Sequence, residues 1–279
     1  MSRDPSIPSD WYDENYYLTD NEGYKQWAES KGAQLSARHQ YCVKLADLRP
    51  GMTTLDYGCG RGEIVRYAAS LGCKSYGLDY SPAAIRMARE TCASLDAAVS
   101  QNANVSLLGP DCNRLPFPDG FLDAIFLIDV IEHLHEWEAR LLLEEVRRTL
   151  KDNGRLILHT GPNKLFFYFG YRFFTRYVNM TANVVLKAAG VRAKLTTVPA
   201  VTEKYHVNEQ SKASLRRLLR EAGLDEKTWL VSRHPTSERP GLVKRVCEAA
   251  YRVISRPAIC WPLDLIFAEH VWAIARRRR

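Results

Sequence analysis

Three side chains that can bind or move protons lie close together in the sequence Asp129-Val-Ile-Glu132-His133. Histidine titrates near neutral pH, so His133 is a candidate general base with Glu132 beside it, and the later His206 is a second candidate. Together the four side chains also offer the oxygen and nitrogen donors that bind a divalent cation. The pattern therefore indicates acid–base chemistry or a metal site, and a histidine that only caps a helix is the alternative for His133.

A glycine-rich stretch predicts a ligand-binding loop. An apolar run ends at Asp56, and three glycines follow at alternate positions between Gly58 and Gly62. Glycine lets a backbone turn sharply and lie against a flat ligand. Glu63 then opens a helix expected over residues 63–71, where a carboxylate would repel a pyrophosphate but not a cationic amino-acid group. The stretch therefore favours S-adenosylmethionine over a dinucleotide.

Both groups follow expected strands. Apolar runs between turn residues predict strands at residues 53–57, 76–79, 105–108, 124–128, 155–159, near 229 and at 267–275. Helices are expected at residues 36–48, 63–71, from 82, and at 136–150, 211–222 and 241–255. Residues 151–154 should form a turn and 276–279 a solvated tail. Strands that alternate with helices predict a doubly wound α/β sheet, which binds ligands at the carboxyl ends of its strands.

The order of these motifs resembles that of the class I S-adenosylmethionine-dependent methyltransferases, over about residues 40–160 and again from 206 onwards. The stretch from Asp56 to Gly62 is similar to their first motif. Asp79-Tyr80 is similar to the acid that holds the ribose and to its adenine-facing neighbour, and Asp111-Cys112 to the loop that recognises the adenine amino group. The resemblance implies S-adenosylmethionine as cofactor and a Rossmann-like sheet of seven strands, the last one antiparallel. The cofactor-binding residues that it implies are Asp56, Gly58, Cys59, Gly60, Asp79, Tyr80, Asp111, Cys112 and Asp129.

Within this superfamily, the sequence from Asp129 to Leu134 differs from the Asn/Asp-Pro-Pro-Tyr of the adenine and cytosine amino methyltransferases. It is similar to the branch that includes the ubiquinone-pathway O-methyltransferases and many methylases of sugars, lipids and natural products. This resemblance implies methyl transfer to oxygen, with Glu132, His133 and His206 at the acceptor. Small-RNA 2′-O-methyltransferases hold a metal with a similar Glu-x-x-Glu-His-His pattern, from which Asp129 and Leu134 depart. A divalent metal is therefore not expected, although Asp129, Glu132, His133 and His206 could hold one.

Residues 161–205 interrupt the alternation of strands and helices, and the excess positive charge lies in the stretch between Asp152 and Glu203 that contains most of them. The chain has 39 basic and 32 acidic residues, and no acidic residue lies between Asp152 and Glu203. A charge confined to one segment favours a local anionic partner over general nucleic-acid binding. No recognised RNA-binding motif accompanies it, so no nucleic-acid partner is expected.

Aromatic residues are also concentrated in this segment, from residue 164 to residue 177. On an α-helix Tyr168, Arg172 and Arg176 would share one face. We expect these three to bind the acceptor as part of a lid, with aromatic rings on an apolar chain and arginines on phosphate. Residues 164–195 could also contact a membrane surface. An ordinary lid helix packed on the domain is the alternative.

The composition suits one α/β domain with elaborations, with 46% hydrophobic and 25% charged residues in a chain of 279. We expect an N-terminal cap over residues 1–35 and a methyltransferase domain over 36–279, with 161–205 as an inserted lid. Seven cysteines without a Cys-x-x-Cys pair favour a reduced, cytoplasmic protein. No signal peptide and no apolar run of membrane-spanning length is recognised in the sequence.

Two other functions remain open at this point. The first is C- or N-methylation of a prenyl diphosphate or a natural product, where the basic segment would bind phosphate. The second is a non-catalytic module that binds S-adenosylmethionine or S-adenosylhomocysteine at a membrane surface.

Overall fold

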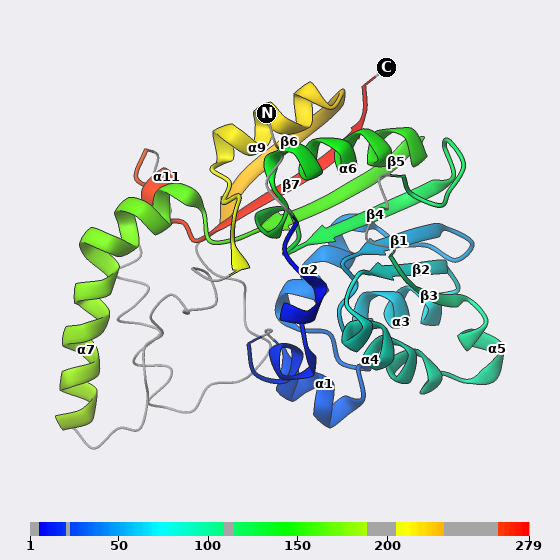
Figure 1. Cartoon of the computed structure of the whole chain (residues 1–279), viewed down its shortest axis with the longest axis horizontal. Coiled ribbons are helices and arrows are strands. Elements are labelled where there is room, and N and C mark those ends of the chain that lie inside the picture. Colours follow the sequence, from blue (N-terminus) through cyan, green and yellow to red (C-terminus); the bar gives the residue numbers. More distant parts are fainter. Residues whose placement is uncertain (1–5, 21–22, 109–113, 189–204, 232–261, 279) are drawn as a thin grey trace.

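The computed structural model describes residues 6–20, 23–108, 114–188, 205–231 and 262–278, and its centre is one seven-stranded sheet (Figure 1). The order of strands is β3-β2-β1-β4-β5-β7-β6. Their bounds are β1 Thr53–Tyr57, β2 Lys74–Asp79, β3 Ala103–Leu107, β4 Leu122–Ile128, β5 Leu150–Thr160, β6 Leu224–Val231 and β7 His270–Arg277. The first five strands are parallel, and β7 is antiparallel to both of its neighbours. This confirms the expected doubly wound sheet with an antiparallel last strand.

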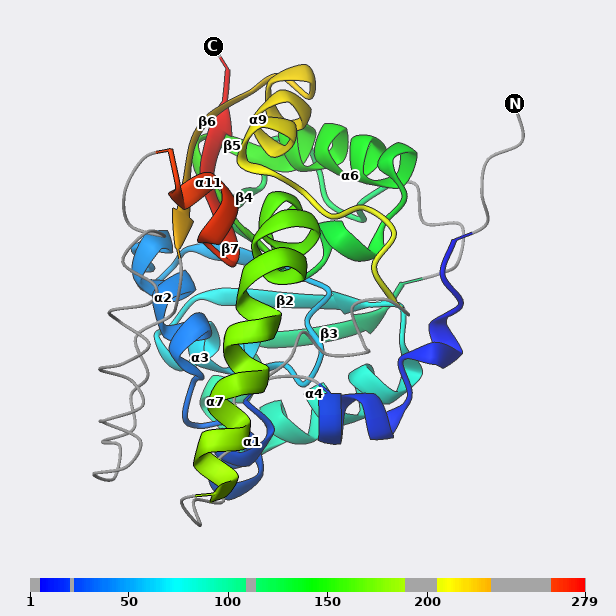
Figure 2. The ribbon, with the colours of Figure 1, turned by 90° about the vertical axis from the view of Figure 1, so that its left-hand side faces the viewer.

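Helices cover both faces of the sheet, because successive residues of a strand point to opposite sides. Leu55, Ile125 and Leu156 pack on one side with α6 (Glu136–Thr149) and α9 (Lys212–Glu221). The other face, with Phe126, Ile157 and Trp272, packs against α2 (Ala37–Ala46) and α3 (Glu63–Ser70). Near β2 and β3 lie α4 (Pro82–Ala93) and the short α5 (Ala97–Ser100). Figure 2 shows the sheet between these two layers.

Several helices begin where the sequence predicts, because a serine side chain caps each one. Ser81 Oγ accepts a hydrogen bond from the backbone nitrogen of Ala84 at 3.2 Å, with Pro82 in the first turn of α4. Ser36 and Ser211 cap α2 and α9 in the same way. These bonds satisfy backbone donors that have no partner within the helix.

Three predictions at element boundaries were wrong or fall outside the described residues. Residues 151–154 are not a separate turn, because β5 already begins at Leu150 and pairs with Leu122 before its register shifts. Arg276 and Arg277 are not a solvated tail, because they pair with β6 as the last residues of β7. The helix expected at 241–255 lies outside the described residues.

The N-terminal segment packs on the body through aromatic side chains. It contains the short helices η1 (Ser9–Trp11) and η2 (Tyr16–Asp20) and the helix α1 (Tyr24–Ser30). Tyr12 and Tyr17 are buried in a cluster with Ala83 and Met87 of α4. The backbone oxygen of Tyr12 accepts a hydrogen bond from Ser81 Oγ at 2.6 Å. These contacts place the segment beside the carboxyl ends of β1 and β2, where ligands of such sheets bind.

The chain leaves the sheet after β5 as a long helical arm. Its first part, η4 (Phe166–Thr175), is a π-helix, and α7 (Arg176–Ala188) continues it. The short helix α11 (Asp264–Phe267) lies so close to η4 that a Cβ at Gly170 would be 2.2 Å from the backbone oxygen of Ile266. In Figure 1 the arm extends away from the sheet. Tyr168 and Arg172 lie on the π-helix and Arg176 begins α7, and residues four positions apart lie on the same side of either kind of helix.

Candidate active site

The glycine loop after β1 is held against the end of β2. Its Gly58, Gly60 and Gly62 all have positive φ angles, which only glycine adopts freely. At Gly62 a Cβ would also lie 2.8 Å from the Cβ of Ala88. The backbone nitrogen of Gly60 donates to Asp79 Oδ2 at 2.9 Å. The loop and the Asp79 carboxylate therefore form one rigid unit at the carboxyl edge of the sheet.

Asp79 is buried at the point where the resemblance expects the ribose-binding acid. Its second carboxylate oxygen accepts a hydrogen bond from the backbone nitrogen of Ser81 at 2.9 Å. Burial raises its pKa to about 6, although the bonds from Ser81 and Gly60 act in the opposite direction. Tyr80 follows it and packs near Tyr12, with 5.5 Å between ring centres. Asp56 and Cys59 are buried in the same region, whereas Asp111 and Cys112 lie outside the described residues.

Glu63 does not have the free carboxylate on which the sequence argument against a dinucleotide depended. Its Oε1 accepts hydrogen bonds from Nε and Nη2 of Arg61 at 3.1 and 2.9 Å, and both side chains are buried. Arg61 Nη1 also donates to the backbone oxygen of Tyr17 at 2.8 Å. Arg61 therefore neutralises Glu63 and attaches the N-terminal segment to the glycine loop.

A second group of side chains gathers beyond the end of β4. The short helix η3 (Ile131–His133) carries Glu132 and His133. The backbone oxygen of Glu132 accepts hydrogen bonds from the backbone nitrogens of Val207 and Asn208 at 2.9 and 3.1 Å. These bonds bring His206 beside His133, with 4.7 Å between the ring centres. The structure thus joins two histidines that are 73 positions apart in the sequence.

The hydrogen bonds of His133 fix its tautomer. Its Nδ1 lies 3.1 Å from the backbone oxygen of Tyr205 and 2.9 Å from the hydroxyl of Tyr12. A carbonyl oxygen only accepts, so Nδ1 carries the hydrogen and Nε2 carries the lone pair. Burial lowers the pKa of His133. The ring is therefore neutral at pH 7, and its Nε2 is available as a base or a metal ligand.

The two other members of this group are also uncharged at neutral pH. Burial, followed by the charge of Asp129, raises the pKa of Glu132 to about 8. Its Oε2 accepts a hydrogen bond from Thr160 Oγ1 at 2.9 Å. Burial, followed by His133, lowers the pKa of His206 to about 3, and the buried Nδ1 of His206 has no hydrogen-bond partner among the described residues.

Three of the four candidate metal ligands come together, and the fourth does not. Glu132, His133 and His206 each offer one ligand atom within 4.8 Å of the others. Asp129 is held elsewhere, by Arg38 and by His159, whose Nδ1 lies 2.6 Å from Asp129 Oδ1. A cation in this group would therefore have one oxygen and two nitrogen donors.

Sequence reasoning missed several residues that build this edge. His159 contacts the Asp129 carboxylate, and His270 contacts His159. Arg38 contacts the same carboxylate from α2. A polar residue at the end of the apolar run of β5 was a signal for His159. The sequence held no comparable signal for Tyr12 or Tyr205, because their roles depend on how two remote segments pack.

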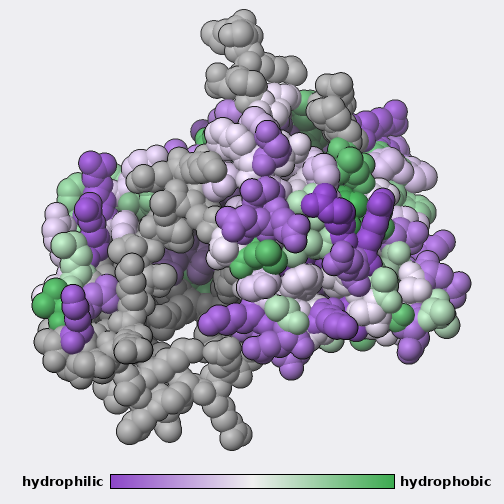
Figure 3. All heavy atoms as spheres, turned by 60° about the horizontal axis from the view of Figure 1, so that its bottom comes forward, coloured by the Kyte–Doolittle hydropathy of each residue, from purple (hydrophilic) through white to green (hydrophobic). Residues whose placement is uncertain are grey.

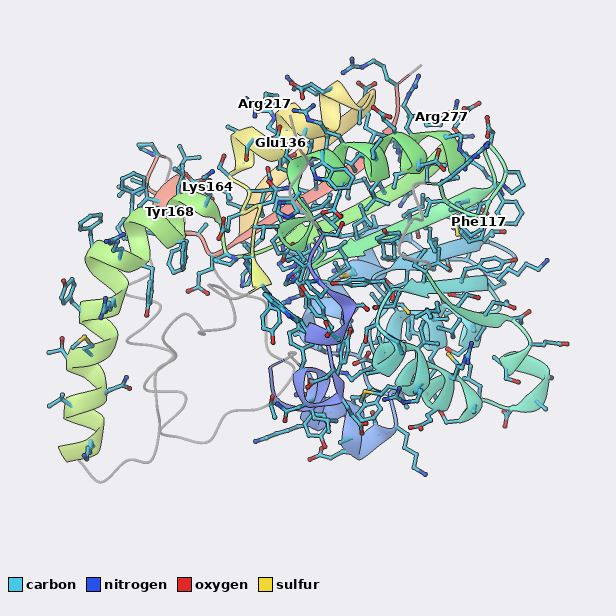
Figure 4. The ribbon with its side chains drawn as sticks, in the orientation of Figure 1. Phe117, Glu136, Lys164, Tyr168, Arg217 and Arg277 are labelled. Atoms are coloured by element: carbon cyan, nitrogen blue, oxygen red, sulfur yellow. The ribbon has the colours of Figure 1, made fainter. Side chains whose placement is uncertain are left out.

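The expected acceptor-binding residues lie on the arm. Tyr168 is on η4 and is partly exposed, and Arg172 and Arg176 are exposed. Figure 4 labels Tyr168 and Lys164 at the start of the arm, at the side of the sheet. None of the helices that the structure describes combines the length and apolarity needed to cross a bilayer.

The chain is similar to known methyltransferases. Residues 55–158 match a family model described as a methyltransferase domain. A demethylmenaquinone methyltransferase of Tropheryma whipplei is 28% identical over 189 residues, which cover 67% of this chain and 72% of the relative. A cyclopropane-fatty-acyl-phospholipid synthase of Escherichia coli is 34% identical over 135 residues, 48% of this chain and 32% of the synthase.

The solved structure of a geranyl diphosphate methyltransferase in complex with geranyl diphosphate and sinefungin shares the fold. Its TM-score is 0.55 at 18% identity, with 86% of this chain and 78% of that chain covered. The likeness supports the architecture described above.

Proposed function

Because the chain is a class I S-adenosylmethionine-dependent methyltransferase acting on a small molecule, we propose that it methylates an oxygen atom of an anionic, lipid-linked acceptor. The observation that carries the choice of oxygen is the lone pair on Nε2 of His133, fixed by the bond from Nδ1 to Tyr205. An acceptor hydroxyl must lose its proton, and a neutral imidazole is the side chain suited to remove it near pH 7. Methylation of a carbon atom also releases a proton, but only after the new carbon–carbon bond has formed, so it depends less on a base that acts before methyl transfer.

The residues of the glycine loop fit the cofactor. The positive φ angles at Gly58 and Gly60 leave the backbone free to approach a flat ligand, and the Asp79 carboxylate lies beside them. We assign the ribose hydroxyls to Asp79 and the adenine to Tyr80, with Asp56 and Cys59 lining the loop. Asp111 and Cys112 keep the expected role at the adenine amino group.

S-Adenosylmethionine supplies an activated methyl group and its own leaving group, so the protein mainly aligns donor and acceptor. His133 would remove the acceptor proton through Nε2, while the carbonyl of Tyr205 stabilises the resulting imidazolium. Glu132 keeps its own proton below about pH 8 and can donate a hydrogen bond to the acceptor. The ring of His206 packs against the ring of His133.

The decisive experiment is transfer of a labelled methyl group into fractionated lipids and small molecules of the source cell. Mass identification of the product should show a methyl ether or ester on a phosphorylated lipid or a lipid-linked sugar. His133→Ala should abolish labelling, and Lys74→Ala, at an exposed residue that begins β2 at the opposite edge of the sheet, should not. Label in N-methyl or C-methyl products would refute the choice of oxygen, and S-adenosylhomocysteine binding without any labelled product would favour the non-catalytic module.

The aromatic surroundings of the site favour methylation of carbon or nitrogen as a second candidate function. Tyr12 lies 5.2 Å from Tyr205, 5.0 Å from Tyr16 and 5.6 Å from His133 between ring centres. Aromatic faces stabilise a cation, such as a carbocation or an amine that gains a methyl group. Relatives named for geranyl diphosphate and fatty-acyl phospholipid are consistent with this candidate. Labelling of geranyl diphosphate by the purified protein would establish it.

The arm supports an acceptor held at a lipid surface. Its exposed large apolar side chains follow one another at intervals of three or four residues, which is the spacing of one helix face. Between 52% and 68% of each is exposed, and they are Phe169, Phe173, Tyr177, Met180 and Val184. Exposed Arg172 and Arg176 lie between them, and Figure 3 shows hydrophobic and hydrophilic residues side by side on the arm. An apolar face flanked by cations suits the surface of an anionic bilayer.

Vesicle sedimentation tests this contact. The protein should bind phosphatidylcholine vesicles that contain phosphatidylglycerol more tightly than pure phosphatidylcholine, and high salt should weaken the binding. Replacing Phe173 and Met180 with serine should reduce binding. Leu107→Ser removes a leucine of similar exposure on β3 and should leave binding unchanged. Binding that ignores both anionic lipid and salt would contradict the proposal.

A reducing compartment agrees with the described cysteines. Cys42, Cys59, Cys73 and Cys92 are free and buried. Free buried thiols are typical of cytoplasmic proteins, so we propose a cytoplasmic enzyme that contacts the membrane through its arm.

A further inference from the structure

The arm leaves the sheet through a buried asparagine. Asn163 lies three residues after the end of β5 and three residues before η4 begins, and it is only 1% exposed. A buried side-chain amide is costly unless its polar atoms form hydrogen bonds. Neither proton removal nor membrane contact explains why an asparagine is buried at this point.

Asn163 binds the stretch between α11 and β7. Its Nδ2 donates to the backbone oxygens of Leu265 and Ala268 at 2.9 and 3.0 Å. Its backbone nitrogen donates to the backbone oxygen of Glu269 at 2.6 Å. Both partners of the side chain are carbonyl oxygens, which only accept, so the orientation of the amide is fixed. The N–H groups of this one residue are therefore all bound to residues 265–269.

The same residue begins the arm. The backbone oxygen of Asn163 accepts a hydrogen bond from the backbone nitrogen of Phe167 at 2.9 Å, and its Oδ1 accepts one from that of Leu165 at 3.3 Å. A side chain that accepts from the first backbone donors of a helix stabilises the start of that helix. Asn163 therefore joins the first turn of the arm to the residues before β7.

The arm has a second contact with α11 farther along. A Cβ at Gly170 would lie 2.2 Å from the backbone oxygen of Ile266, so the two backbones pack directly on each other. Figures 1 and 2 both show α11 beside the start of the arm. A single contact would let the arm rotate about its first residue, but contacts at both Asn163 and Gly170 fix its direction. The base of the arm is therefore braced and does not form a hinge.

The residues just before Asn163 hold the acid of the candidate site. Thr160 Oγ1 donates to Glu132 Oε2 at 2.9 Å, and the backbone nitrogen of Gly161 lies 3.4 Å from Glu132 Oε1. Both donors belong to the turn that Asn163 binds to residues 265–269. A displacement of Asn163 would therefore also change the direction of the Glu132 carboxyl group.

The residue that follows the asparagine, Lys164, holds the segment that carries His206. Its backbone nitrogen donates to the backbone oxygen of Gln210 at 3.0 Å. Gln210 Nε2 donates to Oδ1 of Asn208 at 2.7 Å, and the backbone nitrogen of Asn208 donates to the backbone oxygen of Glu132. Figure 4 shows Lys164 at the start of the arm. The start of the arm is thus bonded to the acid and to the histidine segment on both sides of the buried asparagine.

We propose that Asn163 is a positioning residue, which holds the arm as a fixed platform in one direction relative to the Glu132–His133–His206 group. A platform of this kind does not close over the site as the lid expected from the sequence would. It suits a lipid-linked acceptor that is methylated while its apolar part stays at the bilayer surface.

This inference rests on the proposed function, in which Tyr168 and Arg172 on the arm bind the acceptor. The base then acts on a hydroxyl of the same molecule. An acceptor held by both parts is aligned with the methyl group only if the distance between them stays constant, because small displacements of reacting atoms lower rates strongly.

A distance measurement tests the platform without any acceptor. Spin labels on unnatural amino acids at Val184 of α7 and at Lys74 of β2, both exposed, report the direction of the arm by pulsed electron–electron resonance. The labelled protein should give a single narrow distance peak. Neither S-adenosylhomocysteine nor vesicles of phosphatidylcholine and phosphatidylglycerol should shift it. Two peaks, or a shift with either addition, would overturn the proposal, because a lid moves.

Substitutions at the two contacts extend this measurement. Asn163→Ala should lose the single narrow peak, and Gly170→Ala should do so as well, because it displaces α11 without changing Asn163. Asn104→Ala, at an exposed asparagine on β3, should keep the peak. A peak that stays narrow in Asn163→Ala would contradict the assigned role.

Kinetics with the labelled lipid acceptor separate positioning from folding. Asn163→Ala should lower kcat about 10- to 100-fold, while S-adenosylhomocysteine affinity and vesicle binding stay within about twofold of wild type. Asn163→Ser keeps one donor for the carbonyl oxygens and should recover part of the rate. A parallel loss of rate and of S-adenosylhomocysteine affinity would show that Asn163 only supports folding. If no acceptor is labelled, the proposed function fails, and the distance measurement still decides this inference.

Discussion

Two histidine pairs lie at the carboxyl edge of the same sheet, and they differ in charge. His133 and His206 lie beside Glu132, and all three are neutral at pH 7. His159 and His270 lie behind Asp129, which is an anion. Both carboxylates are in regions where burial raises the pKa. The difference lies in the groups around Asp129, Arg38 first and then His159, which hold its pKa well below the usual range.

This comparison indicates that the neighbouring groups, Arg38 first among them, decide which carboxylate is suited to binding a ligand and which to transferring a proton. A paired carboxylate stays charged and can attract a charged ligand group. An unpaired buried carboxylate takes up a proton, and the imidazole beside it keeps a free lone pair. We therefore assign recognition to the Asp129 side of the edge and proton transfer to the Glu132 side.

The largest expected effect is on turnover. Replacing His133 with alanine should lower kcat about 100- to 10,000-fold, because it removes the proposed general base. S-Adenosylhomocysteine affinity should stay within twofold, since His133 belongs to the other side of the comparison. Steady-state kinetics on the labelled acceptor and calorimetry measure the two quantities. A variant that loses affinity but keeps kcat would reverse our assignment.

The second largest effect is expected on stability when Arg38 is replaced. Arg38→Met should lower the free energy of unfolding by about 2 kcal/mol, because a buried carboxylate without its partner is destabilising. Partial exposure of both side chains keeps the effect below that of a fully buried pair. Urea denaturation at pH 7 measures it. As a control, Arg66→Met removes an exposed arginine side chain that donates to Ser94, and should cost less than 1 kcal/mol.

The sequence predicts the fold better than it predicts which residues surround Glu132 and Asp129. Strands, capped helices and the glycine loop follow from local patterns such as Ser81-Pro82 and the alternating glycines. The position of His206 beside His133 depends on backbone bonds between residues 207–208 and Glu132, which no local pattern encodes. The contact of Arg38 with Asp129 also cannot be predicted from the sequence, because a basic residue on an amphipathic helix is ordinarily exposed. The antiparallel β7 brings His270 to His159 from the far end of the chain.

A smaller effect concerns the pH dependence of stability. The pKa of Glu132 is about 8 in the folded protein and about 4.3 in an unfolded chain. Between these values the folded state keeps a proton that the unfolded state has lost, so this contribution to stability is complete below the unfolded pKa and is lost as the pH rises toward 8. Glu132→Gln does not titrate. Its stability relative to wild type should rise by on the order of 1 kcal/mol per pH unit from about pH 5 to pH 8, and a constant difference would show that Glu132 is charged.

The smallest effect is expected from removing metal. Dialysis against EDTA should leave the rate of methyl transfer within twofold, because the lone pair of His133 can remove a proton without a cation and the Glu132–His133–His206 group supplies only three donors. The same group would give a different result if it held a divalent ion. EDTA would then abolish activity, added Mn²⁺ or Zn²⁺ would restore it, and His206→Ala would prevent the restoration while leaving S-adenosylhomocysteine binding intact. That outcome would assign metal-assisted deprotonation of the acceptor to Glu132, His133 and His206, and ligand recognition would remain with Asp129.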